Sequence, residues 1–482
     1  MKYFRNTALS LFIIAVLFGC YYTLRPNPEG TDYQSKRYPI NADDIDFLYD
    51  LTYRGNNGKI ISEQEIFDRM IVLIDRAERY ILLDMFLFNS YVGKSDNVYR
   101  RLAGELTSRL IKKKHSNPDI KIDFITDPVN IVYGGTISKE LSMLKKEGVN
   151  VIYTDLKKMR DSNILYSPIW RMFFQWFGNS SKGGLFPHPF SESEDLVTLR
   201  SFLALLNFKA NHRKVFLADH ADQLTALVTS ANPHDGSSAH TNVAFEIKGN
   251  FAEEIYIAEN AIAEFSGSRL RGHEFMDYST TQKGTDELIY AQLLTEKKIE
   301  TELVSCINTA EKGDNINIGV FYLSKRDIVD ALIEASERGV DIRLILDPNK
   351  DAFGREKSGI PNRQVASELM NRSEKKIRIR WYDTHGEQFH SKLAFFDFQD
   401  KPAIVILGSA NFTRRNLENY NLELDIKLTA PPTNKTISEV RHYFERIWSD
   451  NKYTSEYSKY EDNSNIKKIW YRFLEATGFS TF

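Results

Sequence analysis

Two short segments carry the same polar residues on what otherwise reads as a buried strand. They are NHRKVFLADH (211–220) and FHSKLAFFDF (389–398). The shared residues are His212, Lys214 and Asp219 in the first segment, and His390, Lys392 and Asp397 in the second. Alternate side chains of a strand share a face, so each histidine lies beside its lysine. An imidazole can attack or carry a proton and an ammonium can hold an anion, so the pairs predict chemistry on a phosphodiester.

The residues downstream of the two segments also repeat. VTSANPHDGSSAHTNVAFEI follows the first and LGSANFTRRNLENYNLELDI the second, which matches Ser230 and Asn232 with Ser409 and Asn411, and Glu246 with Glu423. The serine and asparagine groups can hold non-bridging oxygens, and the glutamates can orient the histidines. Thr229 stands where the second half has Gly408, which predicts a different fit of the first phosphate loop.

Neither a metal nor a cofactor is expected at this site. The sequence has no carboxylate cluster at ligand spacing, and the lysines supply the positive charge that a metal ion would otherwise bring.

The chain around these segments is duplicated. In the first half, apolar spacing predicts helix, strand, helix and strand over 65–80, 80–88, 100–114 and 120–128; in the second, strand, helix and strand over 315–323, 326–339 and 340–348. Asp127-Pro128 and Asp347-Pro348 end matching strands. Alternating strands and helices predict a mainly parallel sheet in each half, and the halves should pack as a pseudo-dimer around one phosphate site.

These paired motifs resemble the phospholipase D superfamily over about residues 45 to 450, and among its members most resemble bacterial cardiolipin synthases. The resemblance implies an α/β fold of two phospholipase D-like α-β-α sandwich domains. It also implies transfer through a phosphohistidine, with His212 as nucleophile and His390 as general acid, although the two roles can be exchanged. The lysines and asparagines would bind phosphate, and Asp219 and Asp397 would support the motifs.

The N-terminal segment is expected to target or anchor the chain. Lys2 and Arg5 precede an apolar run that ends at Gly19-Cys20. A lipoprotein signal with Cys20 lipidated, a single span from about Thr7 to Leu24 and, less favoured, a cleaved signal all remain open. The early positive charges place the body on the extracytoplasmic side of a bacterial membrane.

The predicted organisation has five parts. They are an anchor or signal (1–24), a linker (25–42), a first phospholipase D-like domain (43–285) with an insertion at about 156–208, a second domain (286–450) and a C-terminal helical tail (451–482). The amphipathic helices near the C-terminus are expected to pack against the body. The eight histidines outside the motifs have no repeated partners and are expected on the surface or in loops.

The sequence indicates the type of reaction more precisely than it indicates the substrate. The formal net charge of −2 lowers the expectation of a general nucleic-acid binder. The insertion combines aromatic and basic residues (RMFFQWF, 171–177) and suits a packed helix, a wall of the substrate entrance, an interfacial helix or a surface that stacks single-stranded bases. We expect a membrane-associated enzyme acting on phospholipid, with water or an alcohol as acceptor and no obligate protein partner. The alternative is an anchored extracytoplasmic nuclease, with nucleic acid as substrate.

Overall fold

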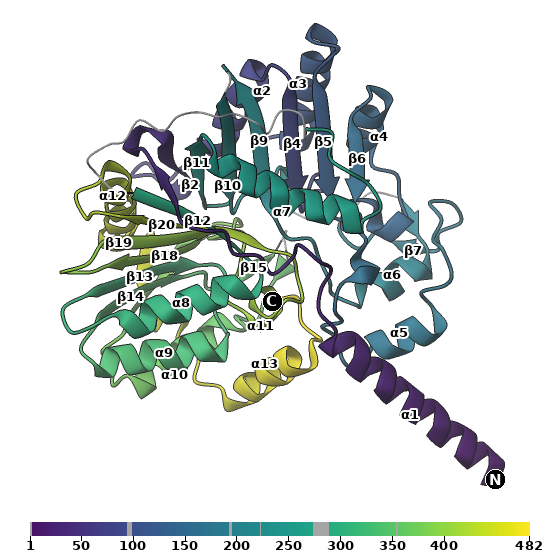
Figure 1. Cartoon of the computed structure of the whole chain (residues 1–482). Helices are drawn as coiled ribbons and strands as arrows, with labels where there is room; N and C mark the ends of the chain where they lie inside the picture. The colour runs from purple at the N-terminus through teal and green to yellow at the C-terminus, as the bar shows by residue number, and fades with distance from the viewer. Residues whose placement is uncertain (1, 94–98, 192–194, 222, 273–288, 353–354) are drawn as a thin grey trace.

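The computed structural model describes residues 2–93, 99–191, 195–221, 223–272, 289–352 and 355–482, and contains two sheets flanked by helices (Figure 1). The predicted boundary between residues 285 and 286 lies outside the described residues. The predicted helices and strands are confirmed over Ile66–Arg76, Tyr80–Met85, Leu102–Ser116 and Lys121–Thr126 in the first half and over Asn315–Val320, Arg326–Glu337 and Asp341–Leu346 in the second.

The first half is built on an eight-stranded sheet. Its order is β3 (Ile60–Glu63), β2 (Ile45–Arg54), β11 (Asn242–Lys248), β10 (Gln223–Thr229), β9 (Lys214–His220), β4 (Tyr80–Met85), β5 (Lys121–Thr126) and β6 (Asn150–Tyr153). One face packs on α2 (Ile66–Arg76), α3 (Leu102–Ser116) and α4 (Lys139–Lys146), and the other on α7 (Phe251–Phe265).

The second half is built on a nine-stranded sheet. Its order is β1 (Tyr38–Ile40), β12 (Ile289–Thr295), β20 (Leu424–Ala430), β19 (Ala403–Gly408), β18 (Lys392–Asp397), β13 (Asn315–Val320), β14 (Asp341–Leu346), β17 (Arg378–Tyr382) and β21 (Thr454–Glu456). Helices α8 (Lys297–Thr309), α9 (Arg326–Glu337) and α10 (Asn362–Arg372) cover its outer face, and α12 (Lys435–Ser449) packs toward the first half.

The prediction of mainly parallel sheets is wrong. Only β4–β5–β6 and β13–β14–β17 pair in parallel, and the other strand pairs of the two large sheets are antiparallel. Helical crossovers join the parallel strands, whereas β9, β10 and β11 follow one another through short connections that reverse the chain. The sheets are therefore mixed.

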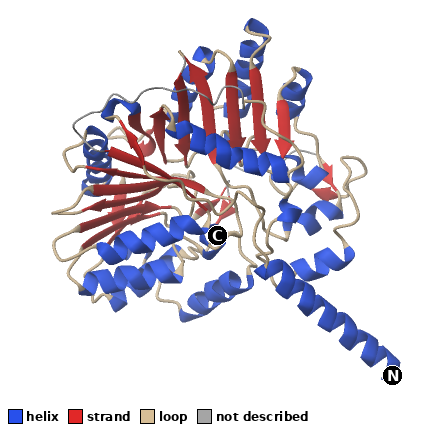
Figure 2. Cartoon of the chain, in the orientation of Figure 1, coloured by secondary structure: helices blue, strands red, loops and turns tan. Residues whose placement is uncertain are grey.

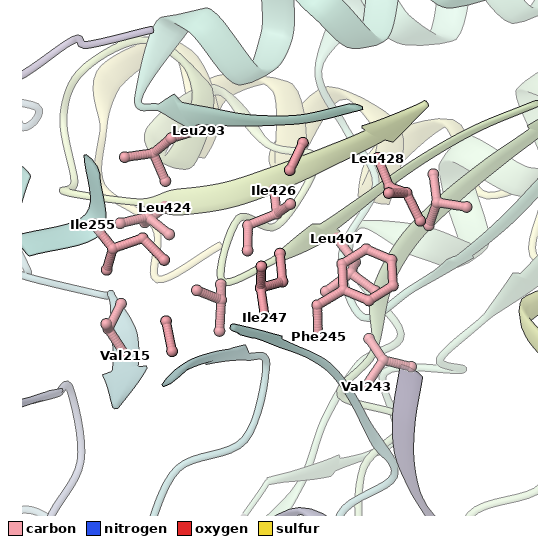
Figure 3. Close-up of a cluster of buried hydrophobic side chains, with 14 of the residues drawn as sticks. Val215, Val243, Phe245, Ile247, Ile255, Leu293, Leu407, Leu424, Ile426 and Leu428 are labelled. Atoms are coloured by element: carbon pink, nitrogen blue, oxygen red, sulfur yellow. The ribbon is translucent and has the colours of Figure 1, made fainter. Parts of the chain in front are cut away.

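A single apolar core joins the two halves. Val215, Phe245 and Ile247 of the first sheet pack with Leu293, Leu407, Ile426 and other side chains of the second, as Figure 3 shows. Tyr443 of α12 lies 5.5 Å, centroid to centroid, from Phe47 of β2. The halves therefore form one body, and their contact fixes the position of the strand ends that carry the two motifs.

The segments at the domain edges are tied into the second sheet. Strand β1 lies within the predicted linker and pairs with β12, and β21 lies within the predicted C-terminal tail and pairs with β17. Helix α13 (Asn465–Thr477) follows β21. These two segments therefore extend the sheet of the second half.

The remaining elements are short, except for the first helix. They are α5 (Ser167–Phe173), β7 (Phe186–Pro187), β8 (Leu196–Val197) and α6 (Leu199–Leu205) in the insertion, and β15 (Asp351–Ala352), β16 (Arg355–Glu356) and α11 (Arg414–Leu417) in the second half. Helix α1 (Lys2–Leu24) projects from the body beside α5 (Figure 2). Within the part of the chain that the structure describes, no helix has the length and apolar character needed to cross a membrane. The predicted span from Thr7 to Leu24 is therefore not supported.

Candidate active site

Each motif histidine lies just before a strand of its own half and contacts the backbone of the other half. Lys214 and Lys392 are the first residues of β9 and β18, and each histidine stands two residues earlier. The backbone N–H of His212 donates to Leu422 O (2.9 Å), and that of His390 donates to Thr241 O (2.9 Å). The symmetry of these contacts supports one shared site between the halves.

His212 is paired with a carboxylate from the opposite half. Its Nδ1 lies 2.9 Å from Glu423 Oε2, and Glu423 is fully buried. Burial lowers the pKa of His212 to about 4, although Glu423 acts to raise it. Burial acts to raise the pKa of Glu423, but His212, Lys214 and Ser409 hold it below its usual value. His212 is therefore neutral beside an ionised glutamate at neutral pH.

His390 occupies the matching position but has an amide partner. Its Nδ1 lies 3.2 Å from Asn242 Oδ1. The Asn242 amide nitrogen donates to His240 O (3.0 Å), which turns the amide oxygen toward His390. Burial first, and then Lys392, His240, Lys214 and His212, lower the pKa of His390 well below its usual value. The two histidines therefore have different electrostatic surroundings.

The matching of Glu246 with Glu423 is wrong. The residue equivalent to Glu423 is Asn242, because Ser230 Oγ donates to Asn242 Oδ1 just as Ser409 Oγ donates to Glu423 Oε2. The loop between serine and partner is two residues shorter in the first half, which shifts the alignment. Glu246 lies farther along β11, where it forms an ion pair with Arg69 (2.6 Å).

The two serines orient the histidine partners. Ser230 Oγ accepts from Val243 N (3.1 Å) and Ser409 Oγ accepts from Leu424 N (3.0 Å) while each hydroxyl donates to Asn242 or Glu423. Their hydroxyl protons are therefore used within the protein. The structure assigns these serines to positioning, which differs from the predicted direct binding of phosphate.

The lysines and asparagines supply the groups that suit an anion. Lys214 and Lys392 are fully buried, and each ammonium donates to the carbonyl of the histidine two residues before it. Burial lowers the pKa of Lys214 to about 7 and that of Lys392 well below its usual value. Asn232 Oδ1 accepts from Leu87 N (3.4 Å), and Asn411 Oδ1 has no hydrogen-bond partner among the described residues.

Asp127 and Asp347 hold the motif strands in place. In the sequence they served only as evidence of duplication. Asp127 Oδ2 accepts from Asn211 N (2.8 Å), and Asp347 Oδ2 accepts from Phe389 N (2.8 Å). Each therefore fixes the residue directly before a motif histidine. Burial raises the pKa of Asp127 to about 7 and of Asp347 to about 6. The available signal was that an Asp-Pro pair ends the matching strand in both halves.

The first half has Thr229 where the second has Gly408, and a neighbouring strand of the second half replaces the missing polar group. Thr229 Oγ1 accepts from Ala231 N (3.0 Å), and in the second half the Asp425 carboxylate accepts from Ala410 N (3.1 Å). A side chain at Gly408 would meet Leu424 O at 2.3 Å and Asp425 Oδ1 at 2.4 Å. The first half pairs Thr229 with Ala244 and the second pairs Gly408 with Asp425, so each half supplies one polar group to the loop.

Asp219 and Asp397 lie away from the histidines. Asp219 is the sixth residue of β9, about 16 Å along the strand from Lys214. It accepts from Tyr80 N (2.7 Å) and Arg79 N (2.8 Å), whereas Asp397 forms an ion pair with Arg441 (2.9 Å). They hold the far ends of the strands, and the structure does not bring them to the site.

Three of the other histidines lie in loops, as expected, but they are buried and not on the surface. His188, His234 and His240 are buried, and the His240 ring centroid lies 5.7 Å from that of His390. Burial lowers the pKa of His240 to about 3. His240 belongs to the wall of the site. Its place in the loop after Ser230-Ala231-Asn232 was the missed signal. His115 and His220 are exposed, and His273 lies outside the described residues.

No group of three or more histidine, cysteine or acidic side chains in the described ranges is arranged to hold a metal ion. Cys20 is exposed on α1. The charge at the site comes from its lysines, and lipidation of Cys20 stays a prediction.

A cavity of about 240 Å³ lies beside the motif of the first half. Its lining includes the apolar side chains of Trp170, Phe174 and Phe177 and the cations Lys157, Arg200 and Lys209. Thr154 also lines it and accepts from the Asn211 amide (3.0 Å), one residue before His212. The insertion therefore builds a partly apolar, partly cationic wall near the candidate site.

Comparisons with known proteins relate part of the sequence to one family and the fold of the whole chain to a solved structure. Residues 303–448 match the family described as "Cardiolipin synthase, PLD-like domain". The crystal structure of phosphatidylserine synthase from Haemophilus influenzae Rd KW20 is similar at a TM-score of 0.58 and 12% identity, over 97% of this chain and 98% of that one. Polyphosphate kinase from Porphyromonas gingivalis gives 0.44 and 13% over 90% and 53%. A comparison with curated protein sequences finds no match.

Proposed function

We propose that the chain is an enzyme of the phospholipase D superfamily, a phosphatidyltransferase of the cardiolipin synthase type that works through a phosphohistidine. The observation that carries the proposal is the contact between His212 Nδ1 and Glu423 Oε2 (2.9 Å). A carboxylate only accepts hydrogen bonds, so the proton of neutral His212 stays on Nδ1 and Nε2 keeps its lone pair. That nitrogen is the proposed nucleophile.

In the first step, His212 Nε2 attacks phosphorus and the bond from phosphorus to the leaving alcohol oxygen breaks. Protonated His390 gives its proton to that oxygen. The His212 ring gains positive charge as the phosphorus–nitrogen bond forms, and the Glu423 carboxylate stabilises it. Lys214 and Lys392 hold the non-bridging oxygens, and the bound anion favours the charged forms of both lysines and of His390.

In the second step, neutral His390 takes the proton of the acceptor hydroxyl, which attacks phosphorus while the bond to His212 breaks. The acceptor is a second alcohol in a synthase and water in a phospholipase. Phospholipid as substrate is supported by the description of the matched family and by the aromatic and cationic cavity next to the motif.

The test is a product assay with detergent-solubilised full-length protein and labelled phosphatidylglycerol, with and without glycerol, and with single-stranded DNA in parallel. We expect cardiolipin or phosphatidic acid from the lipid, and loss of turnover by more than about a thousandfold in His212→Ala and in His390→Ala. His220→Ala is the matched control, because His220 ends the same strand but is exposed and contacts Glu78.

Two outcomes would contradict the proposal. Substantial lipid turnover by His212→Ala, with normal folding, would exclude the shared site. Unreacted lipid with cleaved DNA would identify the nuclease instead.

A further inference from the structure

Helix α13 exposes an apolar stripe rather than burying one. Ile466, Ile469, Trp470 and Phe473 are 82%, 70%, 51% and 48% exposed, and their spacing places them on one helix face. The opposite face packs on the body through Tyr471 and Glu475. The expectation that this helix only packs against the body is therefore only partly correct.

The insertion carries a second exposed stripe. Ile169 and Phe173 of α5 and Trp176 and Phe177 just after it are 44%, 50%, 74% and 64% exposed. Ile169 and Phe173 are four residues apart and share a face of α5, and Trp176 and Phe177 lie in the turn that follows it. Trp and Phe beside basic residues are typical of surfaces that lie at the headgroup level of a bilayer.

The two stripes lie at one edge of the molecule. The backbone N–H of Ile164, just before α5, donates to Thr477 O at the end of α13 (3.1 Å). Ile164 and Leu165 between the stripes are 41% and 54% exposed, and α1 leaves the body from this edge (Figure 1). We name the eight stripe residues of α5 and α13 and these two connecting residues the α5–α13 surface.

The charges around this surface are mainly positive. Glu368 receives ion pairs from four cations, which holds its pKa at about 2 despite partial burial that acts to raise it. The ion pairs beside α13 join five cations, Arg326, Arg372, Lys467, Lys468 and Arg472, to three carboxylates, Asp330, Glu368 and Asp462. Two further carboxylates are Glu461, just before the helix, and the buried Glu475 on it. Lys157, Lys182 and Arg200 are exposed near α5. This excess complements an anionic surface.

We propose that the α5–α13 surface docks the protein on an anionic phospholipid bilayer. A lipid interface can bury the exposed apolar side chains and attract the cations around them, whereas water leaves the apolar side chains exposed. Phe177 belongs to the surface and also lines the cavity beside the motif strand. The docked face therefore leads toward the candidate active site, although the proposal stands on residues outside that site.

The test is flotation of full-length protein with vesicles of phosphatidylcholine alone and of phosphatidylcholine mixed with phosphatidylglycerol. We expect binding to the mixed vesicles that weakens with added salt. Ile469→Glu and Trp176→Glu should each weaken it about tenfold or more, because each removes a large apolar contact and adds repulsion. Val72→Glu is the matched control, since Val72 is 38% exposed on α2 at the opposite end of the molecule.

Other outcomes overturn the proposal. Wild-type protein that does not bind either vesicle, or Ile469→Glu and Trp176→Glu proteins that both bind like wild type, would exclude lipid docking here. A wild-type dimer that Ile469→Glu dissociates would assign the face to a second copy of the chain. His212→Ala should bind vesicles normally, so loss of turnover and loss of docking remain distinguishable.

Discussion

Asn242 offers a direct test of the roles of the two histidines. In Asn242→Asp, a carboxylate replaces the amide oxygen that lies 3.2 Å from His390 Nδ1. A hydrogen bond to a charged partner contributes about 1.5–3 kcal/mol, which corresponds to a pKa rise of about 1–2 units for His390. The sign is upward because an anion favours the imidazolium.

The groups around His390 all disfavour its charged form, so an added anion acts against them. Lys392 on β18, Lys214 on β9 and the His212 and His240 imidazoles all act to lower its pKa, after burial. With His390 as general acid, the protonated form is the active one. The alkaline limb of the kcat/KM profile should therefore move up by about 1–2 pH units in Asn242→Asp.

The opposite assignment makes a different prediction. If His390 is the nucleophile, its neutral form is required, and the acidic limb moves up instead. An upward shift of the acidic limb with an unmoved alkaline limb would refute our assignment of roles. Asn242→Ala is the control for packing, because it removes the oxygen without adding charge and should not raise either limb.

Glu423→Gln completes the comparison. The pKa of His212 is about 4 with Glu423 present and should fall when the carboxylate is removed. His212 then stays neutral from pH 6 to 8 in both proteins, so the acidic limb should not move in that range. Loss of Glu423 should also lower the pKa of Lys214, which is about 7, and shift the alkaline limb down. The rate should fall about 10- to 100-fold throughout, since stabilisation of the charged ring contributes about 1.5–3 kcal/mol.

The remaining predictions concern the frame around the site. Asp219→Ala should lower the free energy of unfolding by about 3 kcal/mol, measured in urea, because it removes the carboxylate that accepts from the N–H groups of Arg79 and Tyr80. Turnover of the folded protein should stay within about threefold. Asp397→Ala, at a partly exposed ion pair, should cost about 1 kcal/mol or less. Equal losses in the two variants would contradict the assigned contacts. Gly408→Thr should destabilise the protein by about 1–3 kcal/mol. Asp425→Ala should restore part of that loss by recreating the Thr229–Ala244 pairing, while the Leu424 carbonyl, 2.3 Å from the added Cβ, keeps the rest. Additive effects in this pair would show that the two positions do not compensate.

The local elements could be predicted from sequence because each has its own periodicity. The helices α2, α3 and α9 and the strands β4, β5, β13 and β14 all follow the apolar pattern of the chain. The motif histidines were also found, because duplication separates His212 and His390 from the other histidines. Long-range strand pairing has no comparable signal, so the antiparallel majority of each sheet was missed.

The partner of His390 was missed for a specific physical reason. A two-residue difference in loop length moved the apparent equivalent of Glu423 to Glu246, and only the serine contacts and the strand register identify Asn242. The outward stripe of α13 was missed because an amphipathic pattern states which residues share a face. It does not state whether protein or another phase covers that face.

The two halves differ at three corresponding positions next to the motifs. Asn242, Thr229 and Ala244 lie on β11 or at the end of β10. The second half has Glu423, Gly408 and Asp425 at the corresponding positions. A symmetric pair of carboxylates would favour protonation of both imidazoles equally. The proposed reaction needs one ring that gains charge when phosphorus binds and another that gives up its proton. A carboxylate beside the first and an amide beside the second make the amide-paired imidazolium the stronger acid, so the asymmetry fits two different roles in one duplicated fold.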